Sequence, residues 1–167
     1  MKKLKIRFNV AMLIAIFTPP ALAVTNDGTA GTNIVAPIAL NYMAGLRFGD
    51  FASHPTQSGT IEIQTDSTKV CSSNLTCFGT SPTGAGTFTV TGADGASYNI
   101  TVPASVTIIG SGAAAGQSMT ATLTGSKTSG TLTSGSDEFT VGGTLTVSAN
   151  QAVGVYSSMF TVTVEYQ

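Results

Sequence analysis

Threonine alternates with apolar residues in one stretch of this chain after another. The clearest example runs from Met119 to Thr124, where every second residue is apolar and the residues between are threonines. A period of two places the apolar side chains on one face of a β-strand and the hydroxyls on the other. The same alternation recurs at 60–64, 87–91, 98–102, 106–108, 139–141 and 145–147. The chain is therefore expected to be all-β.

Composition supports this expectation, because only 9% of the residues are charged and long surface helices would have little material to be built from. Glycine and proline punctuate the alternating stretches and are expected to mark turns or strand bends. They fall at 92–95, 103, 110–112, 125, 130 and 142–143. This spacing of short strands predicts an antiparallel β-sandwich.

The first residues indicate export. Four basic residues within the first seven precede an apolar run from Val10 to Phe17 and the small-residue sequence Ala21-Leu-Ala23. This pattern is typical of a secretory signal peptide, here residues 1–23. The run is too short for the roughly 20 residues that a membrane-spanning helix needs, and Pro19 and Pro20 interrupt it. We therefore expect no transmembrane segment in the mature chain.

Cleavage after Ala23 would leave 144 residues, which is the usual size of one domain. The mature chain would carry three basic and eight acidic residues, for a net charge of −5. It has no tryptophan and no basic patch with which to grip a phosphate backbone. A nucleic-acid partner is therefore not expected.

The end of the chain, from Gly154 to Gln167, predicts a half-buried strand. Every second side chain near its end is apolar and shares one face: Phe160, Val162, Val164 and Tyr166. A domain that stops on such a strand leaves a free edge, whose backbone groups and apolar row need a partner. Assembly with another strand is therefore the leading functional hypothesis.

This ending, with its glycine and penultimate tyrosine, resembles the subunits of chaperone-usher pili. Three further stretches, at 46–51, 59–63 and 139–151, resemble a family of small secreted bacterial domains of unknown function, similar to spore-coat U-type and archaic pilin domains. The resemblance covers most of residues 35–167. It implies an immunoglobulin-like or pilin-like sandwich, either complete or without its last strand.

The resemblance to pilus subunits also implies partners and a location. The partners would be other copies of this chain or related subunits, a periplasmic chaperone that holds the edge strand, and an outer-membrane usher. Export would then run through the periplasm to a pilus, or fimbrium, at the cell surface, or into the medium. Gly154 and the four apolar residues near the end would form the edge that receives a chaperone strand or a donor strand.

A donor strand is expected in the extension at residues 24–34, with residue 40 as its outer limit. Apolar residues recur there with a period of two: Ile34, Ala36, Ile38 and Leu40. An extended segment that adds to a free sheet edge gains main-chain hydrogen bonds and side-chain pockets. If residues 35–42 instead form the domain's own first strand, only a short polar segment remains to serve as donor.

Cys71 and Cys77 are the two cysteines of the chain. In an exported protein we expect them to form a structural disulfide. Free thiols, a redox dithiol and a metal pair are alternatives, although the spacing is longer than Cys-x-x-Cys and no histidine lies nearby to complete a metal site.

Catalysis finds little support in this sequence. The one histidine, His54, lies in an expected loop, and no nucleophile motif is present. Asp66, Asp94 and Asp137 could contribute to a calcium site, but no stretch has the dense ligand spacing of a calcium loop. We expect no catalytic residue, cofactor or metal. Three function classes stay open: a fibre subunit, a self-contained adhesion or coat domain of the surface, and an enzyme.

Overall fold

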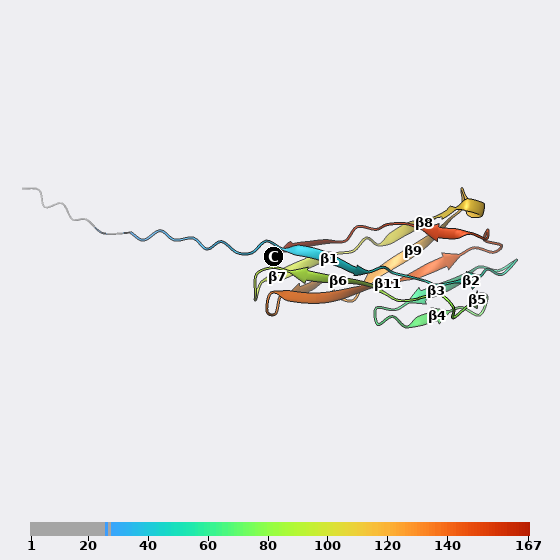
Figure 1. Cartoon of the computed structure of the whole chain (residues 1–167), viewed down its shortest axis with the longest axis horizontal. Coiled ribbons are helices and arrows are strands. Elements are labelled where there is room, and N and C mark those ends of the chain that lie inside the picture. Colours follow the sequence, from blue (N-terminus) through green and yellow to red (C-terminus); the bar gives the residue numbers. More distant parts are fainter. Residues whose placement is uncertain (1–25, 27) are drawn as a thin grey trace, which may run out of the picture. The chain divides into compact units, whose positions relative to one another are not determined.

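A computed structural model describes residues 26 and 28–167, of which residues 34–167 form one compact unit (Figure 1). The expected signal peptide lies outside the described residues, as does Val24 at the start of the expected extension. No strand or helix is present among residues 26 and 28–38. The compact unit is built of antiparallel strands in a sandwich-like arrangement, with one short 3-10 helix, η1 (Gly112–Ala114). The predicted fold class is confirmed.

The larger sheet has eight strands and forms one layer. Its order is β1-β6-β11-β9-β8-β12, with β3 beside β11 and β4 beside β3. These strands are β1 (Ala39–Ala44), β3 (Gly59–Ile63), β4 (Lys69–Cys71), β6 (Gly86–Thr91), β8 (Ser105–Ser111), β9 (Ser118–Gly125), β11 (Ser136–Val147) and β12 (Val155–Ser157). The alternating stretches of the sequence therefore lie in this sheet, apart from 98–102.

Two smaller sheets complete the unit. One has the order β10-β7-β13, with β10 (Ser129–Thr131), β7 (Ser97–Thr101) and β13 (Thr163–Tyr166). The other pairs β2 (Phe51–Ala52) with β5 (Thr76–Cys77). The three-stranded sheet adds the buried side chains of Tyr98 and Ile100 to the common core.

The strands β3 and β6 follow one another along the same edge of β11. Thr144 of β11 pairs with Glu62 of β3 on one side and with Thr122 of β9 on the other. Nearer the start of β11, Thr140 pairs with Thr87 of β6 on one side. On the β9 side, its carbonyl accepts a hydrogen bond from the amide of Ser126. Residues 64–85 are therefore an inserted segment between two strands that would otherwise be continuous.

Gly142 and Gly143 do not separate two strands, so a turn, one of the two expectations there, is wrong. β11 runs through both glycines, and neither has a positive φ. A Cβ on Gly142 would collide with the backbone of residues 63–65, and one on Gly143 would lie 2.6 Å from the carbonyl oxygen of Thr122. These glycines are needed because neighbouring backbones approach β11 closely where β3 gives way to β6.

A polar cluster links β7 to β11. The fully buried Tyr98 donates a hydrogen bond of 2.8 Å to the Asp137 carboxylate, which also pairs with Lys127 at 2.6 Å. Burial and this carboxylate raise the pKa of Tyr98. Burial acts to raise the pKa of Asp137, but the hydrogen bonds from Lys127 and Tyr98 outweigh it and hold that pKa below its usual value. The buried hydroxyl is thus satisfied by an ionised partner.

The predicted C-terminal strand is divided between two sheets. β12 pairs with β8 in the larger sheet, whereas β13 pairs with β7 in the smaller one. Residues 158–162 cross from one layer to the other without strand pairing. The alternation is kept throughout, because the four apolar residues predicted to share a face all pack against the core. The periodicity located the buried face but not the change of sheet.

Candidate functional site

One side of the sandwich contains a long apolar groove with a volume of about 1440 Å³. Tyr42, residues 45–53 and Pro55 form one wall, which Phe78, Ser81 and Pro82 extend, and residues 150–160 form the other. The floor belongs to the larger sheet and is made of apolar side chains from β6, β8, β9 and β11: Phe88, Val106, Ile108, Met119 and Leu145. Arg47 and Asp50 are the charged residues that line it.

The floor is apolar because the alternation of the sheet strands directs these side chains inward. Phe88 stacks on Phe139 with ring centroids 5.3 Å apart. Phe88, Met119 and Leu145 are almost fully buried, whereas Val106 and Ile108 are only partly covered. The three-stranded sheet contributes Tyr98 and Ile100 to the core, but none of its strand residues lines the groove.

The first wall continues from β1. Tyr42 packs edge-on against Phe88 at 5.9 Å, and Phe48 and Phe51 pack against the core. Gly49 has a φ of 75°, a conformation that a residue with a side chain rarely adopts, and Thr83 and Lys69 pack close to it. The wall therefore turns at Gly49 before it reaches β2.

The second wall leads from β12 towards β13. Phe160 packs edge-on against Phe88 with centroids 6.3 Å apart. The hydroxyl of Tyr156 donates to the carbonyl of Ala152 at 2.7 Å and accepts from Gln151 at 2.9 Å. Gly154 lies against Ala114 of η1, where an added Cβ would lie 2.5 Å from that residue's Cβ. Its role is thus close packing against η1, before the edge strand begins.

The backbone of residues 158–162 has no hydrogen-bond partner among the described residues. β13, which follows, pairs with β7 on one edge and has no strand on its other edge among the residues described. Extended backbone beside an apolar groove is the arrangement that accepts an added strand.

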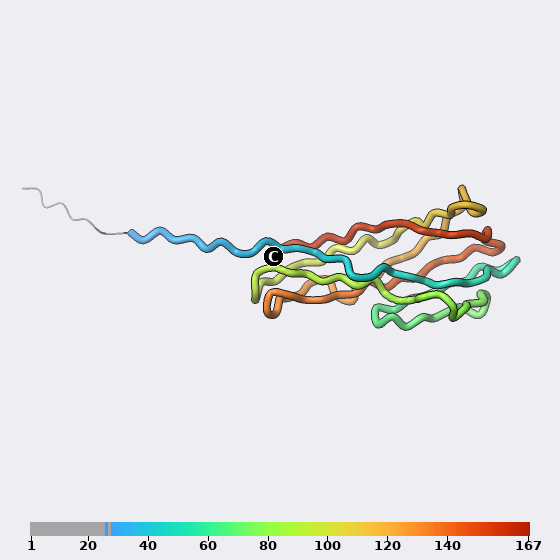
Figure 2. The backbone as a smooth tube through the Cα atoms, viewed as in Figure 1, coloured from blue at the N-terminus to red at the C-terminus, as the bar shows by residue number. Residues whose placement is uncertain are grey.

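Hydrogen bonds join the C-terminal segment to the first wall, or to the chain that leads into it, towards both ends of the groove. At one end the amide of Asn150 donates to the carbonyl of His54 at 2.8 Å. Towards the other end, the Tyr166 hydroxyl donates to the carbonyl of Ala36 at 2.8 Å. Figure 2 shows the C-terminal segment beside the chain that leads into β1.

The structure brings the predicted edge residues together and divides the predicted donor residues. Phe160, Val162, Val164 and Tyr166 are half-buried and pack against the core. Ile34 is 92% exposed, and Ala36 is exposed as well. Ile38 and Leu40 instead pack against this domain's own core, and Leu40 pairs with Val90 of β6. Leu40 thus lies in the domain's own sheet, which leaves the chain before Ile38 as the candidate donor.

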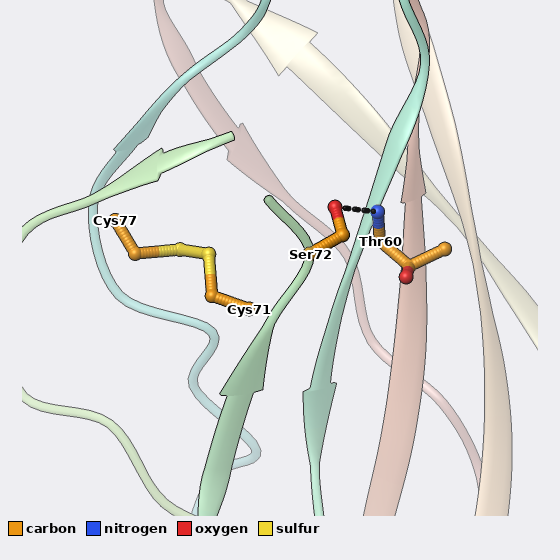
Figure 3. Close-up of a disulfide and its surroundings, with 4 residues drawn as sticks. All are labelled: Thr60, Cys71, Ser72 and Cys77. Atoms are coloured by element: carbon orange, nitrogen blue, oxygen red, sulfur yellow. Dashed lines mark hydrogen bonds between the residues drawn. A yellow bond between two sulfur atoms is a disulfide. The ribbon is translucent and has the colours of Figure 1, made fainter. Parts of the chain in front are cut away.

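Cys71 and Cys77 form the predicted disulfide (Figure 3). Cys71 ends β4 and Cys77 ends β5, so the bond joins the larger sheet to the small β2-β5 sheet. Of the alternatives left open by the sequence, this pairing removes free thiols and a metal pair.

The acidic and imidazole side chains do not gather into a site. His54 lies beside Thr56, whose amide donates to the ring at 3.2 Å. Asp66 accepts the backbone hydrogen bond of Thr68, which lowers the pKa of Asp66. Asp137 is engaged with Lys127 and Tyr98, as described above. Among residues 26 and 28–167, no three potential metal ligands lie close enough to hold an ion.

Sequence reasoning missed most of the groove. Leu46, Phe48 and Phe51 of the first wall entered only as part of a family motif, and Val153 and Met159 of the second wall were not singled out. A usable signal existed for the first wall, because Leu46 and Phe48 are two residues apart and project to the same side. Nothing local marks the second wall, because Val153 and Met159 are 89% and 94% exposed and look like ordinary loop residues.

Comparison with known proteins gives one match. A family model described as a domain of unknown function (DUF4402) matches residues 38–166. No curated protein and no solved structure matches the chain. Within the described part of the chain, no helix is long and apolar enough to cross a membrane.

Proposed function

The chain belongs to this DUF4402 family of unknown function, and from the groove we propose that it is a structural subunit of a surface fibre or pilus. The observation that carries the proposal is the apolar groove beside residues 158–166, whose backbone lacks a partner on that side among the described residues. A strand from a second subunit would fill the groove and pair with this backbone. Subunits joined in series in this way would form a fibre.

The occupant that we propose is the segment before Ile38 of another copy. Residues 28–37 are exposed and belong to no strand. Ile34 could enter the groove as an apolar anchor, and Ala36 would face the same way, because they lie two positions apart in an extended chain. Burial of an Ile side chain stabilises by roughly 1.5 to 3 kcal/mol before ordering costs, and the main-chain hydrogen bonds of the added strand would come in addition.

Before assembly, the same groove would need cover. We propose that a periplasmic chaperone supplies a strand during export and that an outer-membrane usher exchanges it for the next subunit's segment. The support for this step is the apolar floor, which would favour aggregation if it were left open to water. The disulfide supports an oxidising compartment such as the periplasm or the cell surface.

The test is self-complementation. A second copy of residues 24–37, placed after Gln167 through a flexible linker, would turn back and run beside β13 into the groove. The matched control carries Ile34→Asp in the added copy alone, so that the domain itself is unchanged. We expect the added copy to raise the unfolding temperature and reduce polymers to monomers, and the control to do neither. Identical behaviour of the two proteins would refute strand acceptance.

A second candidate function is a self-contained adhesion or coat domain at the cell surface. One observation favours it: Leu40 lies in the domain's own sheet and Ile38 packs against its core, which shortens the free segment. This function predicts that the mature chain is a stable monomer and that the added copy changes nothing. The self-complementation experiment therefore separates the two functions.

A further inference from the structure

The inserted segment 64–85 lies against the first wall of the groove. Its strand β5 pairs with β2 of the wall, so that Cys77 lies opposite Phe51. Just after β5, the amide of Phe78 donates to the carbonyl of Asp50 at 3.0 Å. The wall after its turn at Gly49 is therefore bonded to the insertion.

The insertion also holds the wall before that turn. The amide of Arg47 donates to the carbonyl of Gly84 at 2.9 Å, and the amide of Gly84 donates to the carbonyl of Arg47 at 3.1 Å. The hydroxyl of Ser81 donates to the carboxylate of Asp50. Every backbone hydrogen bond that residues 47–52 make within the described part of the chain ends on the insertion.

The start of the insertion belongs to the larger sheet instead. β4 pairs with β3, and Cys71 lies opposite Ile61. Next to it, two hydrogen bonds of 2.9 Å join Ser72 to Thr60. The Ser72 amide donates to the Thr60 carbonyl, and the Thr60 amide donates to the Ser72 hydroxyl. Figure 3 shows the bond to the hydroxyl beside the disulfide. Cys71 is thus paired with the larger sheet, whereas Cys77 is paired with the wall.

We infer that the Cys71–Cys77 disulfide is a positioning element that holds the first wall of the groove in place for an incoming strand. The inference rests on the proposed function, since it assigns this bond a role in strand acceptance. The disulfide joins the sheet side of the insertion to its wall side, across a loop of five residues. Without it, β5 and the wall paired with it could shift together relative to the floor.

The physical reason is the cost of ordering. A wall that moves in the free domain must be fixed when a strand enters, and that loss of conformational freedom weakens binding. Most of the core does not share this dependence, because its buried side chains lie mainly on strands that pair with one another without the insertion, such as β6, β9 and β11, although Leu75 of the insertion also belongs to the core. Loss of the disulfide should therefore affect the wall more than the sheet.

The experiment compares the mature chain with its Cys71→Ser/Cys77→Ser variant. Hydrogen exchange is measured at two amides that join the wall to the insertion: that of Arg47, which donates to Gly84, and that of Phe78, which donates to Asp50. The reference is the amide of Leu123 in β9, which donates to Ala104 just before β8. We expect exchange in the variant to accelerate at least tenfold at the two wall amides and to stay within about twofold at Leu123. Equal acceleration at all three amides would mean that the disulfide stabilises the whole domain, and would overturn the inference.

Strand acceptance is measured with a synthetic peptide of residues 24–37. We expect the double variant to bind it about tenfold more weakly, which corresponds to about 1.4 kcal/mol. The matched control, Asp66→Ala, removes the hydrogen bond to Thr68 in the same insertion without touching the wall, and should bind normally.

The outcomes separate this inference from the function on which it rests. If the wild type binds the peptide and the double variant binds it equally well, the positioning role is refuted and strand acceptance stands. If none of the proteins binds the peptide, strand acceptance is refuted and the positioning role falls with it. Weaker binding by the double variant alone, with wall-specific exchange, supports both.

Discussion

The hydroxyl of Tyr166 is a single group whose removal should test the placement of the C-terminal strand. It accepts a hydrogen bond from the amide of Ala93 at 2.7 Å and donates one to the carbonyl of Ala36 at 2.8 Å. One atom therefore joins three segments: the turn after β6, the approach to β1, and β13. Tyr166→Phe deletes both bonds and leaves the aromatic ring in place.

The expected loss follows from these two bonds. A hydrogen bond contributes about 0.5 to 1.5 kcal/mol net, so the pair contributes about 1 to 3 kcal/mol. The upper half of this range is expected, because the amide of Ala93 is partly buried and would keep no partner. We therefore expect the free energy of unfolding to fall by about 2 kcal/mol. For a domain of this size that corresponds to roughly 6 to 10 °C in the unfolding temperature.

The assay is urea unfolding of the mature chain and its variants, followed by circular dichroism. The control is Tyr42→Phe, because Tyr42 is 67% exposed and its hydroxyl makes no hydrogen bond among the described residues. That variant should stay within about 0.5 kcal/mol of the wild type. If Tyr166→Phe were as stable as the wild type, or if the two variants lost the same amount, the reasoning would be refuted.

Three other predictions follow from named contacts. Asp137→Asn should lower the free energy of unfolding at pH 7, and should lower it less below about pH 4. The pKa of Asp137 is lowered in the folded protein, so the ionised carboxylate stabilises the fold and this stabilisation is lost as the carboxylate is protonated; unfolding measured as a function of pH checks this. Gly142→Ala should cost about 1 to 3 kcal/mol, because its Cβ would meet the backbone of the adjacent strand; denaturant unfolding measures the cost. Phe160→Ala should cost about 1 to 3 kcal/mol and Met159→Ala almost nothing, since Phe160 packs on the core and Met159 is 94% exposed; equal losses in thermal unfolding would contradict the predicted faces.

The fold class and the faces of the strands were predictable from sequence. Alternation at Met119, Ala121 and Leu123 identified the buried side of β9, and the same rule identified the buried side of the C-terminal segment. The cysteine pair could also be predicted, because two cysteines in a chain that is expected to be exported should be oxidised. All of these inferences use residues that are close together in the chain.

Strand pairing was not predictable in the same way. Leu40 satisfies the alternation equally well as part of a donor strand and as part of β1, and only its pairing with Val90 places it in the domain's own sheet. Gly142 and Gly143 were expected to mark a turn or a strand bend, and only the contacts with the neighbouring backbone show that close approach requires glycine there. Short local patterns are compatible with several partners.

The sequence alone determined that this chain forms a β-sandwich, which residues of each strand face inward, and that the last apolar row lies on one face. The tertiary structure alone decided that β3 and β6 share one edge of β11, that the C-terminal segment crosses between sheets, and that a groove lies between the two walls. The physical reason is range. The period of a strand is set by the geometry of consecutive peptide units, whereas pairing and grooves depend on contacts between residues far apart in the chain.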